Sequence, residues 1–156
     1  MINLSDKLIH LMQQTGWQSW FEILGKENIP QDFFSILEQL NTPMQVKQVR
    51  IAIENGLSYE QINVFAKPEF GGKKMAQMRT GFEYGLGVEQ VQVYAKPVLS
   101  VLQMKHLKLA LVSGLPIEQV EPYAIPSIHY IQIAQLHKKN LPYDVKIKEH
   151  FIHSYD

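Results

Sequence analysis

The sequence of 156 residues contains no cysteine. Disulfide bonds, thiolate metal sites and a cysteine nucleophile are therefore excluded, and a reducing compartment is the expected location. No apolar run approaches the roughly 20 residues that span a bilayer, and the first residues lack the charged start and apolar core of a signal peptide. We expect a globular, cytoplasmic protein with no membrane partner.

The net charge is zero, because 15 basic side chains balance 15 acidic ones. This balance argues against an electrostatic field of the whole protein that would recruit nucleic acid. The charges are unevenly spread, however: residues 44–108 carry nine basic and five acidic side chains. The mildly basic centre therefore keeps nucleic acid as an alternative partner.

Strand-like alternation and recognisable catalytic motifs are absent too. Gly71-Gly72-Lys73-Lys74 lacks the preceding strand and the spacing of a phosphate-binding loop, and indicates a flexible joint between two repeats. His150 and His153 have a spacing that could hold zinc, but no signature of a third ligand accompanies them. We predict a protein without enzymatic activity, catalytic residues, metal or cofactor.

What the chain does contain is a strong internal repeat. A stretch of thirteen residues begins at Gly56 and returns at Gly85 and Gly114, so each copy starts 29 residues after the last. Six aligned positions are identical in all three copies (Gly, Leu, Glu, Gln, Ala and Pro), and a seventh is always Phe or Tyr. A fixed period of this length is typical of a repeat architecture.

Each unit is predicted to hold two short antiparallel helices, here named helix A and helix B. In the first unit, helix A covers residues 44–55 and ends at Gly56, where a left-handed residue is favoured. Ser58 then caps helix B, with Gln61 at the spacing of a capping box, and Pro68 stops it. The repeated Glu in the first turn of helix B suits the helix dipole and needs no catalytic role.

Both ends of the chain resemble degenerate units, in which Asn28 and Asn140 replace the glycine of the turn. We therefore predict an all-α fold, a right-handed stack of helical hairpins (an α-solenoid) with about eleven helices. The single domain, residues 1–156, would comprise an N-terminal helical cap (1–43), three repeats (44–126) and a degenerate C-terminal repeat or cap (127–156). The first 43 residues, which hold both tryptophans, form either this cap or a small recognition element. In the C-terminal part, helices are expected over residues 128–139 and 144–153.

The segment Lys74-Met75-Ala76-Gln77-Met78-Arg79-Thr80-Gly81-Phe82-Glu83-Tyr84-Gly85-Leu86, followed by Val93-Tyr94-Ala95-Lys96-Pro97, resembles a short helical repeat. That repeat is found in proteins of Gram-positive bacteria and their plasmids, phages and transposons. Its usual form is Gln-Met-x-x-Ile-Arg-x-Gly-Leu-Glu-x-Gly-Leu and then Tyr-Ala-x-Pro-x-Phe, and residues 44–126 match it best. The resemblance implies an α-helical repeat protein and brings no active site with it. The unit is similar to a tetratricopeptide repeat in shape only.

Function should lie at positions that differ between the copies. With Val46, Val49 and Ile53 facing inward, the opposite face of each helix A is predicted to point outward and to vary in chemistry. Repeat proteins commonly bind partners along such a face. The predicted binding residues are Lys47, Gln48, Ile51, Gln77, Thr80, Tyr84, Lys105, His106 and Leu109.

The leading hypothesis is therefore a module that binds an unidentified protein or peptide along its helix-A face. The alternative is a nucleic-acid-associated protein, in which the contacts would come from Lys47, Lys73, Lys74, Lys105 and Lys108. In the aligned column Arg50, Arg79 and Lys108, the two arginines have a glutamate four residues on, and Lys108 is expected to be unpaired. A third hypothesis is an enzyme with its site in the N-terminal cap.

Overall fold

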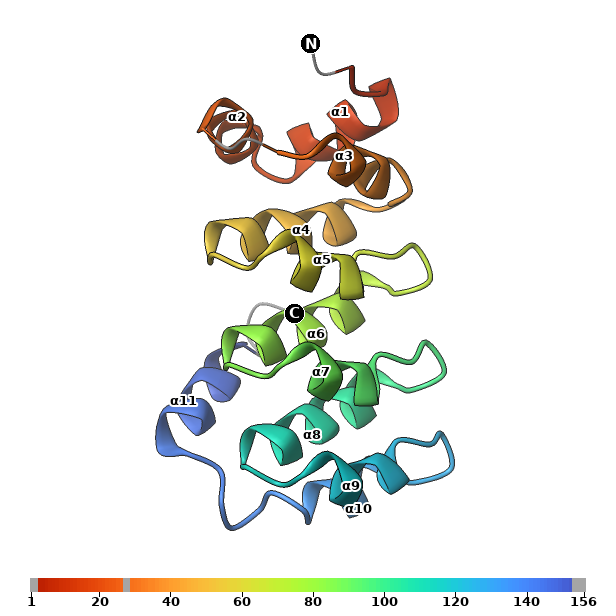
Figure 1. The fold of residues 1–156 in the computed structure, drawn as a ribbon, viewed down its shortest axis with the longest axis vertical. Helices are drawn as coiled ribbons and strands as arrows, with labels where there is room; N and C mark the ends of the chain where they lie inside the picture. The colour runs from red at the N-terminus through yellow and green to blue at the C-terminus, as the bar shows by residue number, and fades with distance from the viewer. Residues whose placement is uncertain (1–2, 27–28, 153–156) are drawn as a thin grey trace. The chain divides into compact units, whose positions relative to one another are not determined.

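The computed structural model describes residues 3–26 and 29–152, with side chains up to residue 150. Every regular element in these ranges is a helix, which confirms the all-α prediction (Figure 1). In chain order they are α1 (Asp6–Gln14), α2 (Trp17–Lys26), α3 (Gln31–Glu38), α4 (Pro43–Glu54), α5 (Tyr59–Phe65), α6 (Gly72–Glu83), α7 (Val88–Tyr94), α8 (Val101–Val112), α9 (Ile117–Val120), the 3-10 helix η1 (Glu121–Tyr123), α10 (Tyr130–Ala134) and α11 (Tyr143–Ile152). None of the helices described is long and apolar enough to cross a membrane.

The chain forms two compact units, Met1–Arg79 and Thr80–Asp156, and the boundary between them falls within α6. In the first unit, α1 packs against α2, α3 and α4, and α2 also packs against α4. In the second unit, α8 packs against α7, α9 and α10. The prediction of one domain over residues 1–156 stays a prediction.

The N-terminal helices are held by a buried tryptophan. Ser5 caps α1 by accepting a hydrogen bond from the backbone N–H of Leu8, and Gly16 follows α1 with a φ of +95°. Trp20 of α2 is fully buried, and its indole N–H donates to the Thr15 hydroxyl at 3.2 Å. Helix α2 runs to Lys26, one residue beyond Gly25.

Arg50 joins α4 to the end of α1. Its Nε donates to the backbone carbonyl of Thr15 at 2.7 Å, and its Nη1 forms the predicted ion pair with Glu54. A cation at the C-terminal end of a helix interacts favourably with the helix dipole. Arg50 therefore stabilises the contact between the N-terminal helices and the first sequence copy.

The three sequence copies end helix A in the same way. Gly56, Gly85 and Gly114 have φ values of +84°, +99° and +102°. The residue after each glycine donates its backbone N–H to a carbonyl five residues earlier, as Leu57 does to Ala52 at 3.0 Å. This is the Schellman motif, and it confirms the predicted role of the repeated glycine as a helix stop.

Helix B ends in a double turn built around the repeated alanine and proline. Ala66 and Ala95 have φ/ψ values of −79°/69° and −75°/65°, those of an inverse γ-turn. Lys67 N–H accordingly donates to the Phe65 carbonyl at 2.8 Å. Phe70 N–H then donates to the Lys67 carbonyl at 3.1 Å, which places Pro68 at the second position of a β-turn, where proline is favoured.

A buried glutamine at the start of helix A holds this double turn in place. Gln45 Nε2 donates to the carbonyls of Pro68 and Phe70 at 3.2 and 2.7 Å, while its Oε1 accepts from the backbone N–H of Asn41 and Thr42. In the third copy, the equivalent Gln103 reaches three carbonyls of residues 125–128 in the same way. One side chain thus caps its own helix and also binds the loop that closes its unit.

The aligned positions 52, 81 and 110 hold the small residues Ala52, Gly81 and Ala110, which allow neighbouring groups to approach closely. At Gly81 the approach is visible, because a Cβ there would lie 2.1 Å from the hydroxyl oxygen of the fully buried Tyr94. Ala52 is equally buried without that difficulty, since its copy carries Phe65, which has no hydroxyl. The size of the small residue is therefore linked to the aromatic residue that follows.

The C-terminal part differs from its predicted helices. Helix α10 covers only Tyr130–Ala134, much less than the expected 128–139, because residues 135–140 form turns with hydrogen bonds such as His137 N–H to the Ala134 carbonyl. The last predicted helix, 144–153, is present as α11, although His153 lies outside the described residues. The connection from α10 leads α11 back towards α8 (Figure 1).

Candidate functional site

A buried ion pair lies at the centre of the second unit. Lys108 of α8 is fully buried, and Glu149 of α11 is 6% exposed. The ammonium nitrogen of Lys108 lies 3.0 and 3.1 Å from the two carboxylate oxygens of Glu149, and it also donates to the Thr80 hydroxyl at 2.9 Å. These contacts satisfy a charge that would otherwise be very costly to bury.

Tyr84 completes this cluster. Its hydroxyl donates to Glu149 Oε2 at 2.8 Å, and its ring lies 5.5 Å from the ammonium nitrogen of Lys108. Burial, and then the hydrogen bond to Glu149, raise the pKa of Tyr84 well above its usual value. The phenol therefore stays protonated and acts as a hydrogen-bond donor to the carboxylate.

Two histidines lie near this ion-pair cluster. His106 Nδ1 of α8 and His137 Nε2 are 2.9 Å apart, and the two rings are stacked. The ring of Tyr130 is also stacked with that of His106, with 5.7 Å between the ring centroids. Burial, followed by the proximity of His137 and of Lys105, lowers the pKa of His106 to about 4. Burial also lowers the pKa of His137. The pair is consequently neutral at pH 7, with one N–H shared between the facing nitrogens.

The helix-A positions that differ between copies supply several of these groups. Thr80 aligns with Ile51 and Leu109, and Tyr84 aligns with Asn55 and Ser113. Both lie near the end of α6, one helical turn apart, so that they meet the two partners of the same ion pair: Tyr84 donates to Glu149 of α11, and Thr80 accepts from Lys108 of α8. The combination of a threonine and a tyrosine at these two positions therefore occurs in one copy only.

The nine predicted binding residues have very different surroundings. Lys47 is exposed, and Ile51, Tyr84, Lys105 and His106 are half-buried. Gln48, Gln77, Thr80 and Leu109 are buried, so the prediction that they point outward is wrong.

The contacts of two buried residues explain this correction. Gln48 Oε1 accepts a hydrogen bond from Arg79 Nε at 2.9 Å. The Thr80 hydroxyl accepts a hydrogen bond from Lys108, which is paired with Glu149 of α11. The structure brings Thr80 and Tyr84 to the same ion pair, Thr80 at Lys108 and Tyr84 at Glu149, whereas Lys47 and Gln48 belong to the first unit.

Lys108 requires a second correction. It was expected to be unpaired and available to a nucleic acid, yet it is fully buried and bonded to Glu149. Glu149 itself was missed, because nothing in its neighbourhood marks it as buried. The available signal was weak: Val145 and Glu149 are four residues apart, and they are the two buried side chains of α11 among those described.

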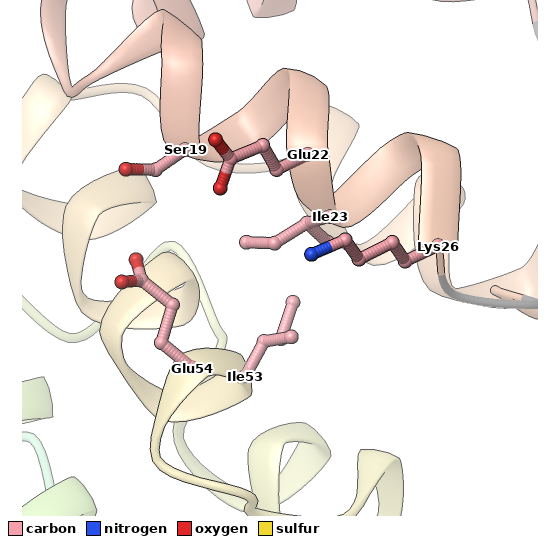
Figure 2. Close-up of a pocket in the computed structure, with 6 residues that line it drawn as sticks. All are labelled: Ser19, Glu22, Ile23, Lys26, Ile53 and Glu54. Atoms are coloured by element: carbon pink, nitrogen blue, oxygen red, sulfur yellow. The ribbon is translucent and has the colours of Figure 1, made fainter.

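A separate groove of about 410 Å³ lies between α2 and α4 in the first unit. Figure 2 shows Ser19, Glu22 and Lys26 of α2 on one side and Glu54 of α4 on the other, with isoleucines between them. Glu54 is already paired with Arg50, and among the described residues no histidine lines the groove to act as a general base. The third hypothesis, an enzyme site in the N-terminal cap, gains no support from these side chains.

Within the part of the chain that the structure describes, no group of three or more His, Asp or Glu side chains could hold a metal ion. Of the two histidines whose spacing could hold zinc, His150 and His153, the second lies outside the described residues. Comparison of the chain with protein families, with curated proteins and with solved structures finds no match.

Proposed function

We propose that the protein is a non-enzymatic module that binds a protein or peptide partner along its helix-A face. In this proposal its hairpins form a right-handed α-solenoid with degenerate caps, located in the cytoplasm. One observation supports the proposal most: α11 of the same chain already rests on this face, where Glu149 bonds to Lys108 and Tyr84, and Lys108 also donates to Thr80. A face that accepts one helix has the shape and the polar groups to accept another.

The burial of Lys108 weakens the nucleic-acid alternative. Of the five lysines assigned to it, Lys47 and Lys73 are exposed and Lys74 and Lys105 are half-buried, whereas Lys108 is enclosed. Counterion release needs cations that can reach phosphates at the surface. Fewer lysines are therefore available to a nucleic acid than the sequence of the protein suggests.

Affinity capture with matched variants tests the proposed function. The full chain is used as bait in an extract of its own cells, beside a Tyr84→Ala/His106→Ala variant and a Val98→Ser control, since Val98 is 68% exposed in a loop away from the cluster. A protein partner should be retained by the wild type and the control and lost with the double variant. Capture that depends on RNA and falls steeply with salt would instead support the nucleic-acid alternative.

A further inference from the structure

Helix α11 is attached to the second unit by few side chains. Of its described residues, Val145 and Glu149 are buried, while Tyr143 is 77% exposed and Ile147 39% exposed. Two buried side chains one helical turn apart form a narrow stripe, and they leave apolar surface of the same helix in water. The apolar contribution to the docking of α11 is therefore small.

The ion pair adds specificity more than net stability. Desolvation of Lys108 and Glu149 offsets most of their attraction, but removal of one partner leaves an uncompensated buried charge. Lys108 consequently requires a carboxylate at this position, and the geometry does not depend on which helix supplies it. Thr80 and Tyr84 are placed to bind either the ammonium or the incoming carboxylate.

We propose that α11 occupies the binding site of a partner helix and is displaced by it, an inference that rests on the proposed function. The partner is an amphipathic helix with an aspartate or glutamate at the centre of its apolar face and an aliphatic residue four positions earlier, as in Val145 and Glu149. Its carboxylate replaces that of Glu149 on Lys108 and Tyr84. Because Val145 is the one apolar side chain that α11 buries among its described residues, a helix with a wider apolar stripe on the same side buries more surface than α11 does.

A second copy of the chain is the less favourable occupant. An exchange of α11 between two chains breaks two ion pairs and forms the same two again, so it gains no contact. Association of two chains also loses translational and rotational freedom. A foreign helix with additional apolar contacts offsets this cost, whereas an exchanged α11 does not.

The test uses a labelled peptide of residues 141–152, acetylated and amidated, as the probe. Fluorescence anisotropy measures its binding to the full chain, to a Glu149→Gln variant and to a Glu149→Gln/Lys108→Met variant. In the wild type, the tethered α11 competes with the peptide at high effective concentration, so the Glu149→Gln chain should bind at least about tenfold more tightly. A peptide with Gln in place of Glu149 should bind that variant at least about tenfold more weakly.

The double variant should bind both peptides with the same weak affinity, because the buried ammonium is gone. Thermal melts followed by circular dichroism check that each variant is folded. If the double variant does not fold, the chain with Lys108→Met alone replaces it in the binding measurements. Equal binding of the acidic and neutral peptides, or no binding to the Glu149→Gln chain, would overturn the proposal. So would light scattering that shows the chain exchanging α11 in dimers.

Failure of this inference differs from failure of the proposed function. A captured partner that is held equally by the wild type and by Glu149→Gln, with no acidic-peptide preference, leaves the binding module intact and places the partner elsewhere. If the inference is right, the Glu149→Gln bait should retain several-fold more of the partner than the wild type. Loss of all capture, with the peptide results as expected, would contradict the proposed function alone.

Discussion

Two adjacent glycines, Gly71 and Gly72, meet different surroundings. A Cβ on Gly71 would have nothing within 4 Å, whereas one on Gly72 would lie 1.8 Å from Cγ and 2.6 Å from Cβ of Met44. These Met44 atoms are close to the backbone and cannot rotate far out of the way. The sequence suggests a flexible joint here, but Gly72 begins α6 and contacts α4 closely.

The pair therefore gives a matched test of packing. Gly72→Ala should lower the free energy of unfolding by about 1–3 kcal/mol, because the overlap outweighs the better helix propensity of alanine. Gly71→Ala should change it by less than about 0.5 kcal/mol. Urea denaturation of both variants measures the difference, and equal stability of the two would show that α4 and α6 are not in close contact.

The facing nitrogens of His106 and His137 predict a dependence of stability on pH. Burial lowers both pKa values in the folded protein, to about 4 for His106, from the usual value of 6.5. Between these pKa values the unfolded chain binds more protons than the folded protein. The contribution of the two neutral histidines to the free energy of unfolding is therefore fully present above pH 6.5 and falls as the pH drops towards 4. Because the His106 ring is partly solvated, we expect a loss on the order of 1 kcal/mol between pH 7 and pH 5.

Urea denaturation at pH 7 and pH 5 measures this loss. The groups that face the pair are Lys105 and Lys108 of α8, Tyr130 of α10 and Glu149 of α11. His106→Asn and His137→Asn should each flatten the pH dependence, since neither asparagine titrates. An unchanged slope in both variants would assign the effect to other groups.

At the scale of the element, one glutamine determines how a helix start and a loop are joined. Gln45 and Gln61 both close capping boxes, on α4 and α5. Gln45 also bonds to the carbonyls of Pro68 and Phe70, 23 and 25 residues away. It is buried, whereas Gln61 is half-buried and caps the exposed N–H of Ser58.

Replacement of each glutamine by leucine separates these two roles. Gln45→Leu should cost about 2–4 kcal/mol, because buried carbonyl and N–H groups lose their partners. Gln61→Leu should cost about 1 kcal/mol or less, the usual value of a cap. The free energy of unfolding in urea gives both values, and faster hydrogen exchange at Phe70 N–H in the first variant alone would locate the damage. Equal costs would mean that the loop does not depend on Gln45.

At the scale of the whole molecule, the features that the sequence predicts are those decided locally. The helix stops at Gly56, Gly85 and Gly114 depend on hydrogen bonds within a few residues, and the Ser58 cap depends on Gln61. Local rules of this kind can be read directly from residue type and spacing.

The candidate site could not be predicted in that way. Lys108 meets Glu149 41 residues later in the chain, and Tyr84 meets it 65 residues later. The helix-A pattern shows which side of α6 and α8 lies opposite the core, but not that α11 covers it. Burial of Thr80 and Lys108 follows from that covering helix, so the same residues that suggested an open surface form an enclosed cluster.

The contact between Gly81 and Tyr94 has a consequence for engineering. Anyone who averages the three units into one consensus sequence will choose Ala for the small position and Tyr for the aromatic one, since each occurs twice. That combination occurs naturally only where Pro122 precedes Tyr123, on a 3-10 turn that leaves the ring half-buried. A designed array of identical units should therefore take either Gly with Tyr or Ala with Phe, as the first two natural units do.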